Sequence, residues 1–63
     1  MMEQIMTFLR LPKVIERTGL SRSLIYAMIK EGRFPAPVRI GLRAVAWHEA
    51  DLLAWAAERK RAH

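Results

Sequence analysis

The 63-residue sequence has no cysteine and only three glycines and three prolines. Without cysteine it forms neither disulfide bridges nor thiolate zinc sites. Its two histidines, His48 and His63, have no closely spaced partner that would complete a metal site. No glycine-rich phosphate loop is present, so we expect no cofactor. A chain this short buries only about 60% of its unfolded surface, and its stability must come from an apolar core, aided by self-association.

Long apolar runs and a secretory leader are also missing. No run approaches the roughly 20 residues that a membrane helix requires, and residues 1–8 contain Glu3 but no basic residue, unlike a signal peptide. These absences predict a cytoplasmic protein with no membrane partner. We expect residues 1–8 to be a flexible tail, in which Thr7 to Arg10 can add a short edge strand. Residues 9–63 are predicted to form a single domain.

The positive charge is unevenly distributed. The chain has 11 basic and 6 acidic residues, a formal net charge of +5, and eight of the bases lie between positions 10 and 43. Residues 44–58 hold three acids and no base, and residues 59–61 are all basic. A basic middle segment is typical of a polyanion-binding surface, although a solvated basic face has the same composition.

Two short helices are predicted on either side of a tight turn. Pro12 suits the first turn of a helix, and Gly19 suits the position just after a helix end. Ser21 is a favoured N-cap for the second helix, which Gly32 ends. A glycine-containing turn of three residues is typical of a helix-turn-helix, and an ordinary helical hairpin has the same turn. The apolar stripe of the second helix is predicted to be Leu24, Ile25, Met28 and Ile29.

A β-hairpin and a third helix are predicted to follow. Prolines at positions 35 and 37 favour extended backbone. The segments 38–40 and 44–47 have the alternation of short half-buried strands around a turn at 41–43. The last helix is expected from about Glu49 to about Arg61, with acids in its first turn and bases in its last that complement its dipole. Its core face is predicted to be Leu52, Leu53, Trp55 and Ala56.

This order of elements predicts a mainly α-helical fold with a small β-hairpin wing, a winged helix-turn-helix. The second helix of that motif lies in the major groove of double-stranded DNA. The predicted recognition-helix contacts are Arg22, Ser23, Tyr26 and Lys30, and the predicted wing and flank contacts are Arg33, Arg39 and Arg43. Arg22, near the N-terminal end of its helix, is placed to bond guanine O6 and N7. The hairpin arginines are placed to reach a phosphate or a narrow minor groove.

Each of these residues also has a purely structural explanation. Arg22 can be a solvated charge near the N-cap, and Tyr26 can bury its ring in the core. Lys30 can pair with acids on its own helix, and Arg43 can solubilise a turn. Both tryptophans are expected in the core rather than as stacking platforms for single strands.

An enzyme is not expected. The residue types of a hydrolase triad are present at Ser21, Ser23, His48 and Asp51, but nothing in their spacing brings them together. No turn resembles a nucleophile elbow. A chain of this length also has little room for a substrate cleft, so we expect no small-molecule substrate.

Several segments form a linked set of motifs: Ser21-Arg22-Ser23, Ile25-Tyr26, Ile29-Lys30-Glu31-Gly32, Phe34-Pro35-Ala36-Pro37-Val38 and Gly41-Leu42-Arg43-Ala44-Val45-Ala46-Trp47. Together with Asp51 and Trp55, this set resembles the AlpA-type prophage regulators over about residues 9–61. The resemblance implies a MerR-like winged fold related to phage excisionases. It also implies a role as a transcription factor for genes of integrated elements.

Three functions follow as alternatives. The first is a sequence-specific transcription regulator, the second an excisionase-like accessory factor that bends DNA for recombination, and the third a protein-interaction module with no DNA role. Leu42 departs from the glycine or polar residue often found at this place in the family, and an apolar wing tip can insert at a base step or contact a second protomer. Because one module of this size buries only about 600–1,000 Å² on DNA, we hypothesise a homodimer or a cooperative oligomer on DNA.

Overall fold

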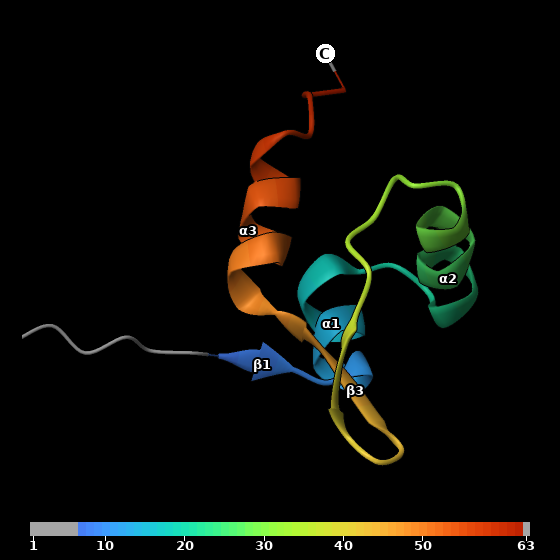
Figure 1. Ribbon diagram of the computed structural model, residues 1–63. Helices are drawn as coiled ribbons and strands as arrows, with labels where there is room; N and C mark the ends of the chain where they lie inside the picture. Colours follow the sequence, from blue (N-terminus) through green and yellow to red (C-terminus); the bar gives the residue numbers. More distant parts are fainter. Residues whose placement is uncertain (1–6, 63) are drawn as a thin grey trace, which may run out of the picture.

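The computed structural model describes residues 7–62, which form three helices and three short strands (Figure 1). The elements are β1 (Phe8–Leu9), α1 (Leu11–Thr18), α2 (Arg22–Lys30), β2 (Val38–Gly41), β3 (Ala44–His48) and α3 (Glu49–Ala57). The predicted order of helix, turn, helix, hairpin and helix is confirmed, and the fold is a mainly helical winged helix-turn-helix. None of the helices within the described range is long and apolar enough to cross a lipid bilayer.

The turn between α1 and α2 is fixed by hydrogen bonds among its own residues. Gly19 has a left-handed backbone with φ 77°, and its N–H donates to the Ile15 carbonyl at 2.8 Å. The Thr18 hydroxyl donates to the Val14 carbonyl at 2.8 Å and accepts from the Leu20 N–H at 3.1 Å. No atom lies within 4 Å of the place a Cβ would take on Gly19, so the backbone conformation rather than space favours glycine.

The strands form an antiparallel sheet in the order β1-β3-β2. Phe8 pairs with His48, and Leu9 pairs with Trp47, which confirms the predicted edge strand. Phe8, the last residue of the predicted tail 1–8, is thus paired in the sheet. The rest of the predicted tail, residues 1–6, lies outside the described residues.

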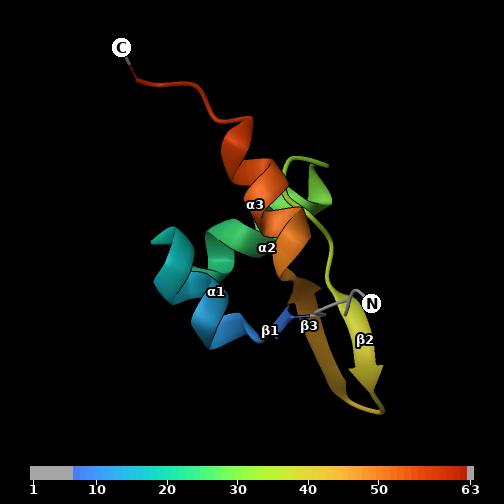
Figure 2. The ribbon, with the colours of Figure 1, turned by 90° about the vertical axis from the view of Figure 1, so that its left-hand side faces the viewer.

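The hairpin of β2 and β3 projects from the helices in both views (Figures 1 and 2). Its register is irregular: Arg39 lies opposite Val45, and Gly41 lies opposite Ala44. Ile40 is thus an extra residue on β2, a β-bulge. The alternating pattern predicted a half-buried strand here, but Ile40 is 44% exposed, because the bulge interrupts the alternation.

The core lies where β3 meets the helices. Trp47, Ile25 and Val14 are fully buried, and further buried side chains complete the cluster: Leu9, Met28, Phe34 and Leu52. The indole N–H of Trp47 donates to the Pro35 carbonyl at 2.8 Å, so burial leaves that donor satisfied. Trp55 is partly buried and packs against the same cluster. Both tryptophans therefore belong to the core, as predicted.

Three of the predicted core residues are on the surface instead. Leu24 is 43% exposed, Leu53 is 58% exposed, and Ala56 is exposed as well. α2 and α3 lie on opposite sides of the molecule (Figures 1 and 2), and each contacts the core along a narrow line of residues three apart. A neighbouring side chain is turned by about 100° from that line, and in so small a domain nothing covers it.

α3 ends at Ala57, four residues before the predicted end near Arg61. The next two backbone N–H groups donate to carbonyls three residues back, both at 3.1 Å, a tightened final turn. The following residues carry no large apolar side chain that would hold another turn against the core. The predicted basic last turn is therefore wrong, whereas Glu49 and Asp51 do occupy the first turn.

The contrast between Ile25 and Leu24 yields a test of the core. Ile25→Ala should lower the free energy of unfolding by about 2–5 kcal/mol, because it opens a cavity at a fully buried site. Leu24→Ala, one residue away on the same helix, should cost less than about 1 kcal/mol. Urea unfolding followed by circular dichroism measures both. Equal losses in the two variants would contradict this core assignment.

Candidate nucleic-acid interface

The outer face of α2 is open to solvent between well-formed helix ends. The Ser21 hydroxyl accepts a hydrogen bond from the Leu24 N–H at 3.1 Å, which confirms the predicted N-cap. At the other end Gly32 is left-handed, with φ 76°, and its N–H donates to the Ile29 carbonyl at 3.0 Å. The predicted contact residues on this helix are all exposed: Arg22, Ser23, Tyr26 and Lys30.

Tyr26 joins the surface of α2 to the core. Its ring meets the buried indole of Trp47 edge-on, with ring centroids 6.4 Å apart, yet the residue is 39% exposed. The Arg22 guanidinium lies 5.9 Å from the centroid of the Tyr26 ring, within the range of a cation–π contact. Tyr26 thus packs on the core by one edge and restrains Arg22 at the start of the helix.

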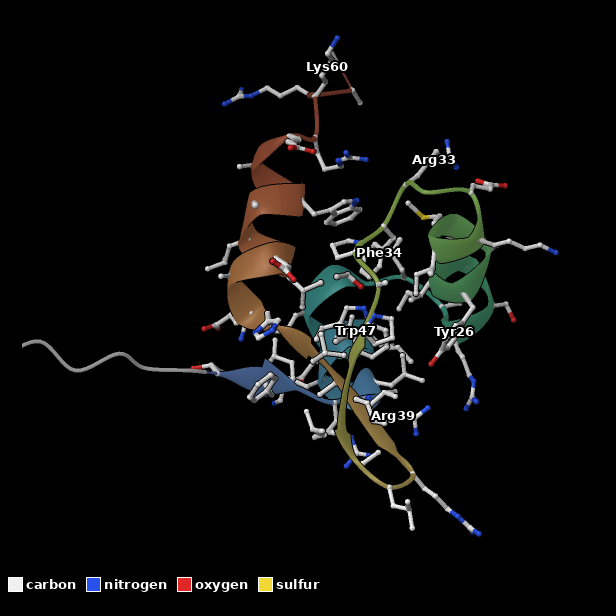
Figure 3. All side chains as sticks on the ribbon, viewed as in Figure 1. Tyr26, Arg33, Phe34, Arg39, Trp47 and Lys60 are labelled. Carbon is white, nitrogen blue, oxygen red and sulfur yellow. The ribbon has the colours of Figure 1, made fainter. Side chains whose placement is uncertain are left out.

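The hairpin carries two exposed arginines. Arg39 donates from Nη1 to the Leu42 carbonyl at 3.0 Å and so crosses the turn, while Arg43 lies within the turn itself and is exposed. A guanidinium has five N–H donors, so this one bond leaves Arg39 able to contact a phosphate. Figure 3 shows Tyr26 beside α2 at the height of Trp47, with Arg39 below both.

Arg33 is separated from the other predicted contacts. Its Nε is 3.0 Å from Glu31 Oε1, an ion pair, and its carbonyl accepts from the Trp55 indole N–H at 2.9 Å. In Figure 3 it lies toward the upper end of the molecule, where Lys60 also lies. The structure therefore does not bring Arg33 together with the hairpin arginine Arg39.

We use the name α2–hairpin face for the exposed predicted contacts of the two elements: Arg22, Ser23, Tyr26, Lys30, Arg39 and Arg43. Most described carboxylates are paired with bases outside it. Within residues 7–62 the ion pairs are Lys13–Glu16, Arg17–Glu49, Glu31–Arg33 and Glu58–Arg59. None of them includes the remaining predicted contacts: Arg22, Lys30, Arg39 and Arg43. A hydrogen bond from Lys13 and the charge of that lysine lower the pKa of Glu16, so this carboxylate stays negative beside its partner. The α2–hairpin face keeps its positive charge without a described carboxylate against it.

The structural explanation of Lys30 is an ion pair with an acid on its own helix. α2 contains no acidic residue, and Glu31, which follows it, bonds to Arg33. Among residues 7–62, Lys30 therefore has no ion pair with an acid of its own helix, and this structural explanation is wrong.

A cavity lies away from most of the predicted contact residues. One cavity of about 370 Å³ lies between α3 and the segment that follows α2, and its lining includes Trp55, Phe34 and Arg33. Apart from Arg33, it contains none of the predicted contact residues. Among residues 7–62, no group of three or more histidine, aspartate or glutamate side chains is placed to hold a metal ion.

The sequence pattern missed an apolar component of this surface. Leu24 on α2 and Ile40 on β2 were assigned to buried positions and are exposed. Leu42, at the hairpin turn, is 88% exposed. Periodicity alone gives no signal for the first two, because an apolar residue beside a core stripe is assigned to the core by default.

Comparisons with known proteins identify relatives of this chain. Residues 7–60 match the family model described as "Prophage CP4-57 regulatory protein (AlpA)". The chain is 35% identical over 57 residues to the DNA-binding transcriptional activator AlpA of Escherichia coli strain K12. This alignment covers 81% of each of the two proteins. No solved structure matches.

A second relative comes from a phage. The chain is 48% identical over 52 residues to the uncharacterized protein ORF88 of Enterobacteria phage P4. The match covers 82% of this chain but only 59% of the phage protein. This chain therefore spans little more than half the length of that relative.

The two serines at the start of α2 give a matched pair of variants. Ser21→Ala should lower the free energy of unfolding by about 0.5–2 kcal/mol, because it removes the cap of the Leu24 N–H. Ser23→Ala, an exposed position on the same turn, should stay within about 0.5 kcal/mol of wild type. Thermal unfolding at matched concentrations compares them, and a larger loss in Ser23→Ala would refute the capping role.

Proposed function

Since the chain belongs to the AlpA family of prophage regulatory proteins, we propose that it is a transcription regulator that binds specific sites in double-stranded DNA. Its targets would be genes of a prophage or another integrated element. The family and the named Escherichia coli relative point to a DNA-binding regulator rather than an enzyme. The proposal adds specificity for sequence and a particular set of contact residues.

The observation that carries the proposal is the set of exposed bases on α2 and the hairpin, Arg22, Lys30, Arg39 and Arg43. These bases have no ion-pair partner among residues 7–62. Basic side chains that replace the counterions of DNA provide most of the sequence-independent affinity of a DNA-binding protein. A face whose charges are not already neutralised within the protein is the one best able to do so.

The DNA contact proposed for each residue of α2 follows from its position along the helix. Arg22, at the first position of α2, reads a base edge in the major groove, because the N-terminal part of a recognition helix points at the bases. Ser23 donates to a phosphate or a base, and Tyr26 donates its hydroxyl to a phosphate. Lys30, at the far end, contacts the DNA backbone.

The hairpin would contact the DNA beside that groove. Arg39 and Arg43 supply guanidinium groups for a phosphate or for a narrow minor groove. Arg33 would be a weaker flank contact, because its Nε is engaged with Glu31. Contacts from both elements would fix the orientation of the domain on the duplex.

Two of the four residues that supply the triad types, Ser21 and His48, have structural roles instead. The Ser21 hydroxyl caps α2. His48 is the N-cap residue of α3 and pairs with Phe8 across the sheet. These positions favour a binding protein over a hydrolase.

A salt titration tests the proposal. Wild type, Arg22→Ala and Lys60→Ala are titrated with duplexes from the promoter of the gene and with random duplex of equal length. Specific binding should weaken by roughly 0.9 log units per log unit of salt for each phosphate contacted. Arg22→Ala should lose about 1–3 kcal/mol of preference for the specific duplex.

Lys60→Ala is the matched control, because it removes one positive charge from the segment after α3 and leaves α2 and the hairpin unchanged. It should keep the preference for the specific duplex. If wild type binds neither duplex at low salt, the proposed function fails. If both variants lose the same preference, Arg22 does not read a base.

The number of copies on DNA forms part of the same proposal. One module of this size buries only about 600–1,000 Å² on DNA, which favours a homodimer or a cooperative oligomer on its site. Sedimentation of the complex should therefore show two or more chains per duplex. A strict monomer, both free and on DNA, would contradict this expectation.

A further inference from the structure

The tip of the hairpin is apolar and lies between guanidinium groups. Leu42 is 88% exposed and is the most exposed large apolar residue among those described. Ile40, two residues before it, is 44% exposed. Arg39 and Arg43 flank this pair in the chain, and both are exposed. An exposed leucine at such a place contributes nothing to the core.

The turn itself gives no reason for a leucine. Gly41 pairs with Ala44, so Leu42 and Arg43 form a two-residue connection, where glycine, asparagine and aspartate are preferred. The turn is held by the bond from Arg39 Nη1 to the Leu42 carbonyl at 3.0 Å. This bond depends on the backbone of residue 42 and not on its side chain. A residue that breaks a local preference without a structural gain is a candidate for function.

The bulge at Ile40 adds a second observation. A β-bulge bends its strand, increases the local twist and re-aims the side chains beside it. The irregular register lies between Arg39 and Gly41, directly before the turn. The bulge therefore gives the end of the hairpin its own bend and twist, different from those of the regularly paired residues Val38 and Arg39. Leu42 lies at that end.

The hairpin lies on the side of the molecule that the proposed DNA face occupies. In Figure 3 Arg39 lies below Tyr26 and Trp47, and the Tyr26 ring packs edge-on against Trp47 on β3, the strand that pairs with the strand of Arg39. With α2 in a major groove, the hairpin beside it meets the adjacent backbone and minor groove. Apolar side chains that enter a minor groove partly unstack a base step and bend the duplex.

We propose that Leu42 is an apolar wedge that enters the minor groove at a base step, with Arg39 and Arg43 contacting the phosphates on either side. This inference rests on the proposed function, since it assigns the hairpin tip to the same DNA complex. It makes DNA deformation, and not only base contact by α2, a source of site preference. Flexible pyrimidine–purine steps would be favoured at the place of insertion.

The test uses the specific duplex from the salt titration, with one 2-aminopurine placed in turn at each step of the flanking minor groove and a fluorophore pair at its ends. Wild type should raise the 2-aminopurine fluorescence at one step and shorten the end-to-end distance, as expected for a bend of about 20–90°. Leu42→Gln should lose both signals and bind about tenfold more weakly. Its salt dependence should be unchanged, because no charge is removed.

Two further variants complete the design. Leu42→Met keeps a flexible apolar side chain and should keep the fluorescence signal. Leu53→Gln makes the same chemical change at a leucine on α3 that is 58% exposed, and it should match wild type in every measurement. Circular dichroism checks that each variant is folded, as expected for substitutions at exposed positions.

Three results would overturn the wedge while leaving the proposed function intact. They are a wild-type complex without unstacking at any step, a Leu42→Gln complex with wild-type affinity and bend, and loss of self-association by Leu42→Gln in sedimentation without DNA. The last would assign the apolar tip to a second copy of the chain. Absence of binding by wild type to any duplex would overturn the proposed function, and the wedge with it.

Discussion

Trp47 stands on β3, and its indole is buried completely while its N–H donates to the Pro35 carbonyl at 2.8 Å. The same residue pairs with Leu9 across the sheet and receives the edge of the Tyr26 ring from α2. A buried indole removes a large apolar area from water and requires a partner for its single donor. In so small a chain, these contacts decide how the sheet, α2 and the following linker are placed.

The second tryptophan, Trp55, bonds to the same segment two residues earlier in the chain, at Arg33. The Trp55 indole N–H donates to the Arg33 carbonyl at 2.9 Å, and its ring lies 4.8 Å, centroid to centroid, from the ring of Phe34. The segment 31–37, which leads from α2 to the hairpin, is thus hydrogen-bonded at Arg33 and Pro35 by indole groups from α3 and β3. The relative placement of the helix and the wing proposed to bind DNA depends on these two bonds.

Basic residues have different tasks in different parts of the chain. Arg17 bridges α1 to Glu49 at the start of α3, with a distance of 3.0 Å, and the Arg59 guanidinium lies 4.8 Å from the centroid of the Trp55 ring. These side chains stabilise contacts between or along helices. Arg22 and Arg43 have no carboxylate partner among residues 7–62, and the same is true of Arg10, Lys60 and Arg61. The proposed interface is therefore defined by the position of its cations on α2 and the hairpin, and not by their lack of ion pairs alone.

Burial was the property that sequence patterns predicted least well. Leu24 and Leu53 lie next to true core residues in the helical pattern, and both are exposed. Whether such a flanking residue is buried depends on what packs against the helix, and 63 residues provide too few elements to cover both flanks. The end of α3 was misplaced for a related reason, because continuation of a helix depends on packing as well as on propensity.

The sequence by itself determined the ends of α1 and the start of α2, the turn between them, and the extended linker. These features depend on Gly19, Ser21 and the prolines at 35 and 37, which act on backbone groups only a few residues away. Tertiary structure alone decided that Tyr26 packs edge-on against Trp47 and that the Arg33 carbonyl accepts from the Trp55 indole N–H. It also decided that Ile40 forms a bulge before an exposed Leu42. Each of these outcomes depends on which distant groups compete for the same space or the same partner, and no local pattern encodes that competition.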